Sequence, residues 1–578
     1  MSSVNFEENV KILMRDDIVT YCDVFKPSGS GKHPVLLMRT PYDKSASMSR
    51  TMIIDAITAA SEGYAVVIQD VRGRHSSSGD FYTFHNEIDD GFDSIDWAAS
   101  QSWSTGKVGM YGSSYVGATQ WLAARSQHPA LAAICPGVTA SDYHEGWAWQ
   151  GGAFELAFNL SWSAGPLVQG NWDNISATVD TEGISSSDIV AFKDNLDEGF
   201  RKLPLSSHSV LKKNLAPYYY DWIKHPEFDD YWRTISIEDH HQDISVPAFN
   251  IGGWHDIFLG GTLRNFNGMS SNGKTKFARG GQKLLIGPWV HGNNGILAGD
   301  YGFGTLSSRS SADLHGRALA YFDQWLKEDD PLVQNDTSVR IFVMGSNEWR
   351  DEDSWPLERA IDTPFYLHSK GGANSLLGDG VLSQTSPDRE IEDSFLYNPQ
   401  FPVPTVGGSL CCDEVFTKSG IYDQQFVEQR SDVLVYTSEA VTEDLEVTGP
   451  VKVTLYASSS AQDTDFTAKL VDVDKDGFAR NLTDGIIRSR YRNKRTGAVF
   501  VEPGTIVSYE IDLWATSNVF LKGHKIRLEI SSSNFPRFDR NLNTGGEIGE
   551  ETNFQSALQK VYHSGQFPSH VTLPLIPK

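Results

Sequence analysis

The sequence predicts an α/β fold in which a parallel sheet is interrupted by a helical insertion and followed by a β-rich segment. Over residues 1–140, short apolar runs alternate with amphipathic stretches. Residues 141–243 are rich in aromatic side chains and carry few strand signals, whereas residues 356–578 contain short runs of alternating apolar and polar positions. Alternating strands and helices are typical of a sheet covered on both faces, and regularly spaced short strands are typical of a sandwich.

The elements expected in the first segment follow from these patterns. Four short apolar strands are expected, at 35–38, 64–69, 108–111 and 131–134. Helices are expected at 88–99, where apolar residues recur at steps of four, three and four, and at 115–125. Strands that are joined by crossing helices favour parallel pairing.

The same sheet is expected to continue beyond the insertion. Strand signals resume at 246–251 and 283–286, and one helical face is apolar over 314–325. We therefore predict a core made of residues 1–140 and 244–355, an inserted helical domain at 141–243, and a sandwich or jelly roll at 356–578.

Charge and cysteine content exclude several classes of protein. The 49 Lys and Arg residues face 74 Asp and Glu residues, a net charge of −25 that disfavours a nucleic-acid partner. Four cysteines are too few for a disulfide framework, and the adjacent Cys411 and Cys412 are not expected to bridge. No apolar run approaches the ~20 residues of a membrane span, and the N-terminal stretch lacks the apolar segment of a signal peptide. We expect a cytoplasmic protein without a membrane partner.

The strongest chemical signal is the turn Gly112-Ser-Ser-Tyr-Val-Gly117, between an expected strand and an expected helix. A serine on such a turn has its hydroxyl lifted above the sheet edge, and the helix N-terminus can hold a developing oxyanion. The G-x-S core favours Ser114 over Ser113 as the nucleophile. The second glycine lies one position further on than in the common G-x-S-x-G pattern, and an ordinary N-capping serine is the alternative.

Partners for such a nucleophile follow in the expected chain order of serine, acid and histidine. Asp256 follows the strand at 246–251, and His291 follows the strand at 283–286. Both are therefore expected on loops at the same sheet edge as Ser114, and the three are predicted to form a catalytic triad.

Three rival residues are expected to have structural or solvent-facing roles. His255 adjoins Asp256 but is expected to point elsewhere, Asp243 precedes its strand, and His144 belongs to the insertion. A further candidate is Tyr42, which follows the strand at 35–38. Its hydroxyl is expected either to join the Tyr115 N–H in an oxyanion hole or to pack.

No metal or cofactor is expected. Residues 472–477 resemble the start of a calcium loop, but position twelve is Thr483 rather than a glutamate, so a hairpin turn is expected. The acidic and histidine run at 238–243 lacks an i, i+4 histidine pair and is expected to be a solvated charge run.

The motifs together resemble those of the cocaine esterase and X-prolyl dipeptidyl-peptidase family of serine hydrolases. Besides the serine turn, the matching segments are 39–44, 69–73, 252–256, 287–291, 343–350 and 531–536. The resemblance implies an α/β-hydrolase core, an inserted helical cap and a C-terminal jelly roll. It also implies the triad Ser114, Asp256 and His291, with Tyr42 and the Tyr115 backbone as the oxyanion hole.

The resemblance further implies an aromatic acyl pocket that includes Trp147, Trp162 and Phe258. Where esterases of this family carry leucine and phenylalanine, the chain has Cys411 and Cys412. Loss of a phenyl wall enlarges the pocket and removes a stacking partner, so a benzoyl ester is not the expected preferred substrate. Dipeptide release is not expected either, because the extra N-terminal helical domain of the peptidase members is absent from the sequence.

We therefore expect a serine carboxylesterase that cleaves small-molecule acyl esters through an acyl-enzyme. The alternatives are an amidase or β-lactam acylase of the same family, similar to a glutaryl-cephalosporin acylase, and, more remotely, a non-catalytic binding protein. The resemblance also implies a homodimer.

Overall fold

A ten-stranded mixed sheet organises the first half of the chain. The computed structural model describes residues 3–292, 294–327, 337–493 and 497–578. Within them the strand order is β1-β2-β4-β3-β5-β6-β9-β10-β13-β14, with parallel pairing from β4 through to β13. The strands are β1 (Val4–Leu13), β2 (Val19–Pro27), β3 (His33–Thr40), β4 (Ala65–Asp70), β5 (Ser104–Ser113), β6 (Leu131–Gly137), β9 (Phe249–His255), β10 (Lys283–Val290), β13 (Val339–Val343) and β14 (Glu348–Glu352).

Both faces of this sheet are buried, as the continuous apolar runs in its strands require. On one face, Val35 and Leu37 of β3 pack into the cluster that holds α3 (Glu87–Ser100) and α4 (Tyr115–Arg125). On the other face, Leu36 and Met38 of the same strand pack with α2 (Ala56–Ser61) and α13 (Leu314–Phe322). The predicted α/β core is therefore confirmed.

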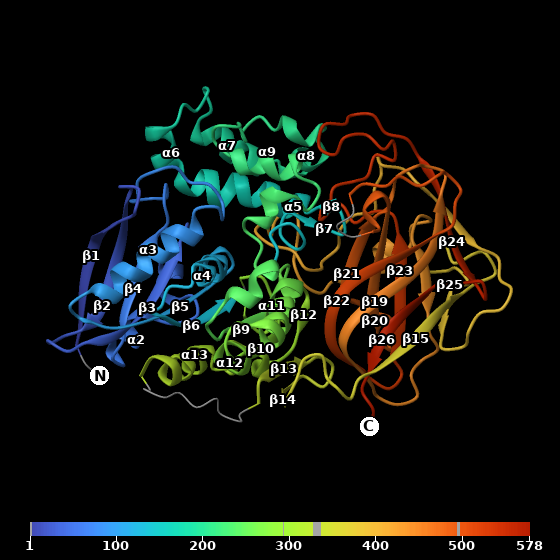
Figure 1. Cartoon of the computed structure of the whole chain (residues 1–578). Coiled ribbons are helices and arrows are strands. Elements are labelled where there is room, and N and C mark those ends of the chain that lie inside the picture. The colour runs from blue at the N-terminus through green and yellow to red at the C-terminus, as the bar shows by residue number, and fades with distance from the viewer. Residues whose placement is uncertain (1–2, 293, 328–336, 494–496) are drawn as a thin grey trace.

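The segment between β6 and β9 forms a helical cap. Figure 1 shows it as the green-cyan layer above the sheet. Its helices are α5 (Leu156–Trp162), α6 (Trp172–Thr178), α7 (Ser186–Lys193), α8 (Leu196–Arg201), α9 (Pro217–Lys224) and α10 (Asp230–Arg233), accompanied by a hairpin of β7 (Trp149–Gln150) and β8 (Ala153–Phe154). Aromatic side chains fill its interior, with Trp147, Trp149, Trp162, Trp222 and Trp232 all almost fully buried.

After the cap, the chain returns to the core, which gains two further helices, α11 (Leu259–Asn272) and α12 (Lys276–Gly280). In the described residues the second half of the chain is then dominated by strands. They are β15 (Ile361–His368), β16 (Val381–Ser383), β17 (Asp393–Tyr397), β18 (Leu434–Thr437), β19 (Leu445–Ser459), β20 (Asp465–Val473), β21 (Ala479–Arg488), β22 (Val507–Phe520), β23 (Lys525–Ser531), β24 (Ala557–Ser564), β25 (Phe567–Pro568) and β26 (His570–Leu575).

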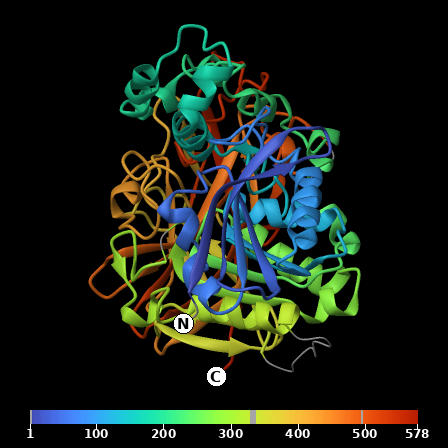
Figure 2. The same cartoon turned by 90° about the vertical axis from the view of Figure 1, so that its left-hand side faces the viewer.

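The β-rich half packs against both the core and the cap. Figure 2, which looks from the side of β1, shows the cap above the sheet and the C-terminal strands behind it. The Phe154 N–H of the cap donates to Asp539 Oδ1 at 2.7 Å, and the Arg488 N–H donates to the Gly151 carbonyl at 2.7 Å. Leu410 and Phe535 belong to the same apolar cluster as the cap tryptophans.

Two segments that superficially resemble metal sites have other roles. Residues 474–478 connect β20 and β21, which pair antiparallel, so the expected hairpin turn is confirmed. In the 238–243 run, Glu238 pairs with Arg264 and His240 contacts Asp243. Across the described ranges, no helix is long and apolar enough to span a membrane. The exact domain boundaries at residues 140, 243 and 355 stay a prediction.

Candidate active site

Ser114 lies on a sharp turn between the end of β5 and the start of α4. Its backbone has φ 63° and ψ −129°, a conformation that non-glycine residues rarely adopt. The Ser114 N–H donates to the Gly137 carbonyl of β6 at 2.9 Å, and the Gly117 and Ala118 N–H groups donate to the Ser114 carbonyl. Strand and helix thus hold the strained residue from both sides.

The two glycines of the motif are required by close packing at this turn. A Cβ at Gly112 would lie 2.2 Å from Val116 Cγ1, and one at Gly117 would lie 2.9 Å from Thr139 Cβ. The second glycine therefore allows the first turn of α4 to approach the chain that leaves β6. This contact explains why a glycine is useful at position 117.

His291 and Asp256 come together with Ser114 at the C-terminal edge of the sheet. His291 Nε2 lies 3.0 Å from Ser114 Oγ, and His291 Nδ1 lies 2.7 Å from Asp256 Oδ2. The Asp256 side chain is fully buried, and that of His291 is 9% exposed. These contacts form one continuous hydrogen-bonded chain from hydroxyl to imidazole to carboxylate.

Phe258 supports this arrangement in two ways. Its N–H donates to Asp256 Oδ1 at 2.7 Å, so each oxygen of the carboxylate has a partner. Its ring packs edge-on against the His291 imidazole, with the centroids 5.2 Å apart. The imidazole is therefore held by its hydrogen bonds to Asp256 and Ser114 and by this aromatic contact.

Tyr42 lies just beyond β3, in the same cavity as Ser114. Its hydroxyl oxygen accepts a hydrogen bond from Trp162 Nε1–H at 3.0 Å. Burial raises the pKa of Tyr42 to about 12, while its hydrogen-bonding contacts with Trp162 and Ser114 partly oppose that rise. The phenol therefore stays protonated and keeps its own O–H proton to donate.

The side chain of Tyr115 is directed into the core, so only its backbone is available for the predicted oxyanion hole. The Tyr115 hydroxyl donates to Glu87 Oε1 at 2.9 Å and accepts from the Phe84 N–H at 2.9 Å. Its N–H belongs to the first residue of α4, where a helix leaves its donors without intrahelical partners. That N–H follows Ser114 directly, as expected of an oxyanion donor.

A cavity of about 330 Å³ opens in front of Ser114 and His291. Of the five predicted pocket residues, Trp162 and Cys412 line it. Trp147 and Phe258 instead stack on each other, with ring centroids 4.3 Å apart and planes 11° apart, and Cys411 is 4% exposed. Trp147, Phe258 and Cys411 do not line this cavity, and their part in the substrate pocket stays a prediction.

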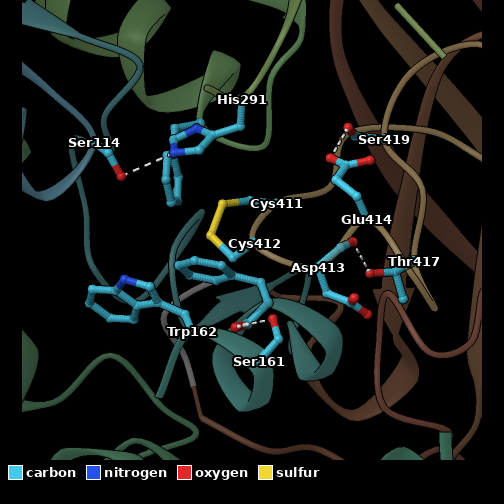
Figure 3. The surroundings of a disulfide bond; sticks show 12 residues. Ser114, Ser161, Trp162, His291, Cys411, Cys412, Asp413, Glu414, Thr417 and Ser419 are labelled. Atoms are coloured by element: carbon cyan, nitrogen blue, oxygen red, sulfur yellow. Dashed lines mark hydrogen bonds between the residues drawn. A yellow bond between two sulfur atoms is a disulfide. The ribbon is translucent and has the colours of Figure 1, made fainter. Parts of the chain in front are cut away.

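Cys411 and Cys412 form a disulfide, which corrects the expectation that they would not bridge. Cys412 has a φ of 75°, so the chain turns through a left-handed residue at the disulfide. The following loop is closed by the Thr417 hydroxyl, which donates to the Asp413 carbonyl at 3.0 Å. Figure 3 shows the disulfide between His291 and Trp162, facing the side on which Ser114 lies.

The rival residues lie outside this chain of contacts. His255 is fully buried at the end of β9, and burial lowers its pKa to about 4. Asp243 contacts His240, and His144 Nε2 contacts the Pro226 carbonyl in the cap. No group of three or more metal-binding side chains is found across the described parts of the chain.

Sequence reasoning missed most of the residues that line the cavity. They are Met48, Thr51, Met52, Ile53, Val138, Pro166, Ile251, Gly292, Asn294, Arg309 and Leu314. Among them, Arg309 and Asn294 have side chains able to donate to an anion. Neither stands in a motif, and no local pattern singles them out.

Comparisons with known proteins agree with this geometry. The chain matches the X-Pro dipeptidyl-peptidase (S15 family) model over residues 16–293 and the X-Pro dipeptidyl-peptidase C-terminal non-catalytic domain model over residues 332–572. Cocaine esterase from Rhodococcus sp. (strain MB1 Bresler) is 38% identical over 576 residues, which cover 98% of each chain.

Solved structures show the same architecture. An α-amino acid ester hydrolase superposes with a TM-score of 0.80 at 26% identity, over 99% of this chain and 97% of the other. An aminopeptidase from a marine sediment Thaumarchaeota archaeon shares the fold, with a TM-score of 0.83 at 24% identity over 100% and 97%. The predicted resemblance is confirmed: the chain belongs to the X-Pro dipeptidyl-peptidase (S15) family, together with cocaine esterase.

Proposed function

We propose that this protein is a serine hydrolase that cleaves small-molecule carboxylic esters through an acyl-enzyme on Ser114. The observation that carries the proposal is the hydrogen-bonded chain of Ser114, His291 and Asp256 at the wall of a largely apolar cavity. A serine hydroxyl becomes a competent nucleophile when a neutral base takes its proton and an acid orients that base. Two relatives, cocaine esterase and α-amino acid ester hydrolase, are named for ester cleavage.

Acylation begins when Ser114 Oγ attacks the ester carbonyl while His291 Nε2 takes its proton. The tetrahedral intermediate carries its negative charge on the former carbonyl oxygen. Asp256 stabilises the imidazolium that forms and holds Nδ1 protonated. His291 then returns the proton to the departing alkoxide, and the acyl group remains on Ser114.

The oxyanion is held by two donors, the Tyr42 hydroxyl and the Tyr115 N–H. Fixed donors aimed at a developing charge stabilise the transition state more than the ground state. Because Trp162 already donates to the Tyr42 oxygen, the phenol proton remains for the oxyanion. Deacylation repeats these steps with water as the nucleophile and His291 as its base.

Amide cleavage is the alternative chemistry for the same residues. An amine is a poorer leaving group than an alcohol and must be protonated as it departs, which places a greater demand on His291. Kinetics on matched ester and amide pairs with one acyl group separate the two activities. The proposal expects kcat/KM to favour the ester.

The test of the nucleophile is covalent labelling with a fluorophosphonate, followed by peptide mapping. The label is expected on Ser114, and S114A should lose both labelling and ester turnover by several orders of magnitude. The neighbouring variant S113A is the matched control and should still be labelled. Labelling of S114A, or no labelling of the wild type, would refute the mechanism and favour a binding protein.

A cytoplasmic location and a homodimer also remain part of this proposal. Cell fractionation tests the first, and light scattering of the purified protein tests the second.

A further inference from the structure

The cavity at Ser114 has one cationic side chain that is not explained by the hydrolytic mechanism. Much of its lining is apolar and includes Met48, Met52, Ile53 and Leu314. Arg309 and Asn294 line the same cavity. An arginine is an expensive group to place against such a surface unless something pairs with it.

The position of the Arg309 side chain is fixed, but its charge is unpaired. Its Nη2 donates to the carbonyls of Thr51 and Ile53, each at 2.9 Å. A guanidinium has five N–H donors, so Nε–H and both Nη1–H groups remain without a partner in the parts of the chain that the structure describes. The backbone carbonyls orient the group without neutralising it.

No carboxylate of the described residues forms an ion pair with Arg309, although the chain carries 74 acidic residues. Burial lowers the pKa of Arg309, and no acidic neighbour opposes that shift. Two other arginines have acidic partners: Arg264 pairs with Glu238, and Arg350 pairs with Glu446. An unpaired, half-buried cation beside a catalytic serine is suited to receive an anion from the substrate.

Asn294 provides a second, neutral donor beside this cation. The Arg309 N–H donates to the Asn294 carbonyl at 2.7 Å, which keeps the two residues adjacent. Asn294 lines the cavity, and a side-chain amide can donate to one carboxylate oxygen while the guanidinium donates to the other.

The position of His291 indicates which part of the substrate reaches Arg309 and Asn294. His291 must protonate the leaving alkoxide, so the alcohol portion lies beside the imidazole during the reaction. Asn294 lies three positions after His291, and its carbonyl accepts the Arg309 N–H, so both residues lie on the part of the cavity lining that follows His291 in the chain. Trp162 and Cys412, which the family resemblance assigns to the acyl pocket, also line the cavity.

We infer that Arg309 and Asn294 bind a carboxylate carried by the alcohol portion of the ester, so that the enzyme prefers acyl esters of hydroxy acids. This inference rests on the proposed ester hydrolysis and specifies its substrate class. The guanidinium recognises the carboxylate by charge-assisted hydrogen bonds, and the apolar wall accommodates the carbon skeleton between the carboxylate and the scissile bond.

The first test compares two leaving groups of similar shape on the same butanoyl group. Butanoyl esters of 3-hydroxybenzoate and of 3-hydroxybenzamide differ only in the charge of one substituent. The wild-type enzyme should have a higher kcat/KM for the benzoate ester. Because the readout is a ratio, loss of general activity does not affect it.

Variants then assign this ratio to the two residues. R309Q should reduce the benzoate-to-benzamide ratio by about 10- to 100-fold, the range expected for losing hydrogen bonds to a charged group. R309K should restore part of it, and N294A should reduce it less than R309Q does. R317Q, on the nearby helix α13 but outside this cavity, is the matched control and should keep the wild-type ratio.

A binding measurement avoids any dependence on how the variants fold. Free 3-hydroxybenzoate should inhibit wild-type hydrolysis of a neutral ester more strongly than 3-hydroxybenzamide does. Equal inhibition, or an R309Q ratio equal to that of the wild type, would overturn the inference.

A last arm tests the assignment to the alcohol portion. If Arg309 instead governs discrimination between 4-nitrophenyl half-esters of glutarate and 4-nitrophenyl pentanoate, the carboxylate belongs to the acyl portion and the inference is wrong. Ser114-dependent turnover of the neutral ester would still support the proposed function, so the two failures are distinguishable.

Discussion

The indole of Trp162, in the cap, donates its Nε1–H to the Tyr42 hydroxyl, in the core, at 3.0 Å. One hydrogen bond therefore links the inserted domain to the proposed oxyanion hole. It occupies a lone pair of the phenol and directs the phenol proton elsewhere. In the proposed mechanism, the cap therefore orients an oxyanion donor of the core through Trp162.

This relationship predicts the effects of two substitutions. Y42F should lower kcat for a 4-nitrophenyl ester by about 10²–10³, the loss expected for one oxyanion donor. W162F removes only the orienting donor and should cost about tenfold, close to the energy of one neutral hydrogen bond. Steady-state kinetics measure both effects. Y366F, on β15 and remote from the site, should keep the wild-type kcat, and a fully active Y42F would remove Tyr42 from the mechanism.

The contact between Asp256 and His291 predicts the result of an isosteric change. D256N should lower kcat on the order of 10³- to 10⁴-fold, because an amide neither favours the correct imidazole tautomer nor stabilises the imidazolium. The rate of fluorophosphonate labelling should fall in parallel. The control is D243N, whose carboxylate contacts His240 outside the site. A comparable loss in D243N would indicate damage to the fold rather than to the base.

The Cys411–Cys412 disulfide is predicted to shape the acyl side of the cavity. Cys412 is exposed and lines the cavity, so a dithiol can reach the disulfide. Reduction opens the small ring that the disulfide closes between the two adjacent cysteines, and it thereby frees this part of the cavity lining. We expect the ratio of kcat/KM for benzoyl and butanoyl esters to change on reduction. The double variant C411S/C412S should not respond to the dithiol.

Thiol counting provides an independent check on this prediction. Cys22 and Cys135 are free and buried, so the denatured protein should show two thiols before reduction and four after it. Four thiols in untreated protein would contradict the disulfide.

Glu155, at the junction of the cap and the C-terminal strands, predicts how stability depends on pH. Burial raises the pKa of Glu155 to about 8, only partly opposed by Arg537, whose Nε lies 3.8 Å from the carboxylate. The folded state therefore holds a proton that the unfolded chain loses near pH 4.5. The stability that this proton contributes is complete below about pH 4.5 and is lost as the pH rises towards 8.

The variant E155Q keeps a neutral side chain at every pH. At pH 9 it should exceed the wild type in unfolding free energy by about 1–3 kcal/mol, with a smaller difference at pH 5. Denaturant titrations at both pH values measure this. E358Q changes an exposed glutamate and should show no such pH-dependent gain. Parallel behaviour of E155Q and wild type between pH 5 and 9 would refute the raised pKa.

Much of the core could be predicted because its signals are local. The apolar runs of β3, β4, β5 and β6 are each continuous in sequence, and the glycines beside Ser114 mark the turn that follows β5. Asp256 and His291 could be proposed because parallel strands end at one edge of a sheet, which turns strand order into proximity. For these residues, position in sequence nearly determines position in space.

The walls of the cavity could not be predicted in this way. The sequence determined the family, the sheet and the order of Ser114, Asp256 and His291, because each depends on short-range pattern. Tertiary structure alone decided that Trp147 stacks on Phe258, that Cys411 bridges Cys412, and that Arg309 reaches the cavity of Ser114. Those outcomes depend on side-chain packing between segments far apart in the chain and on one left-handed residue, and neither has a periodic signature in sequence.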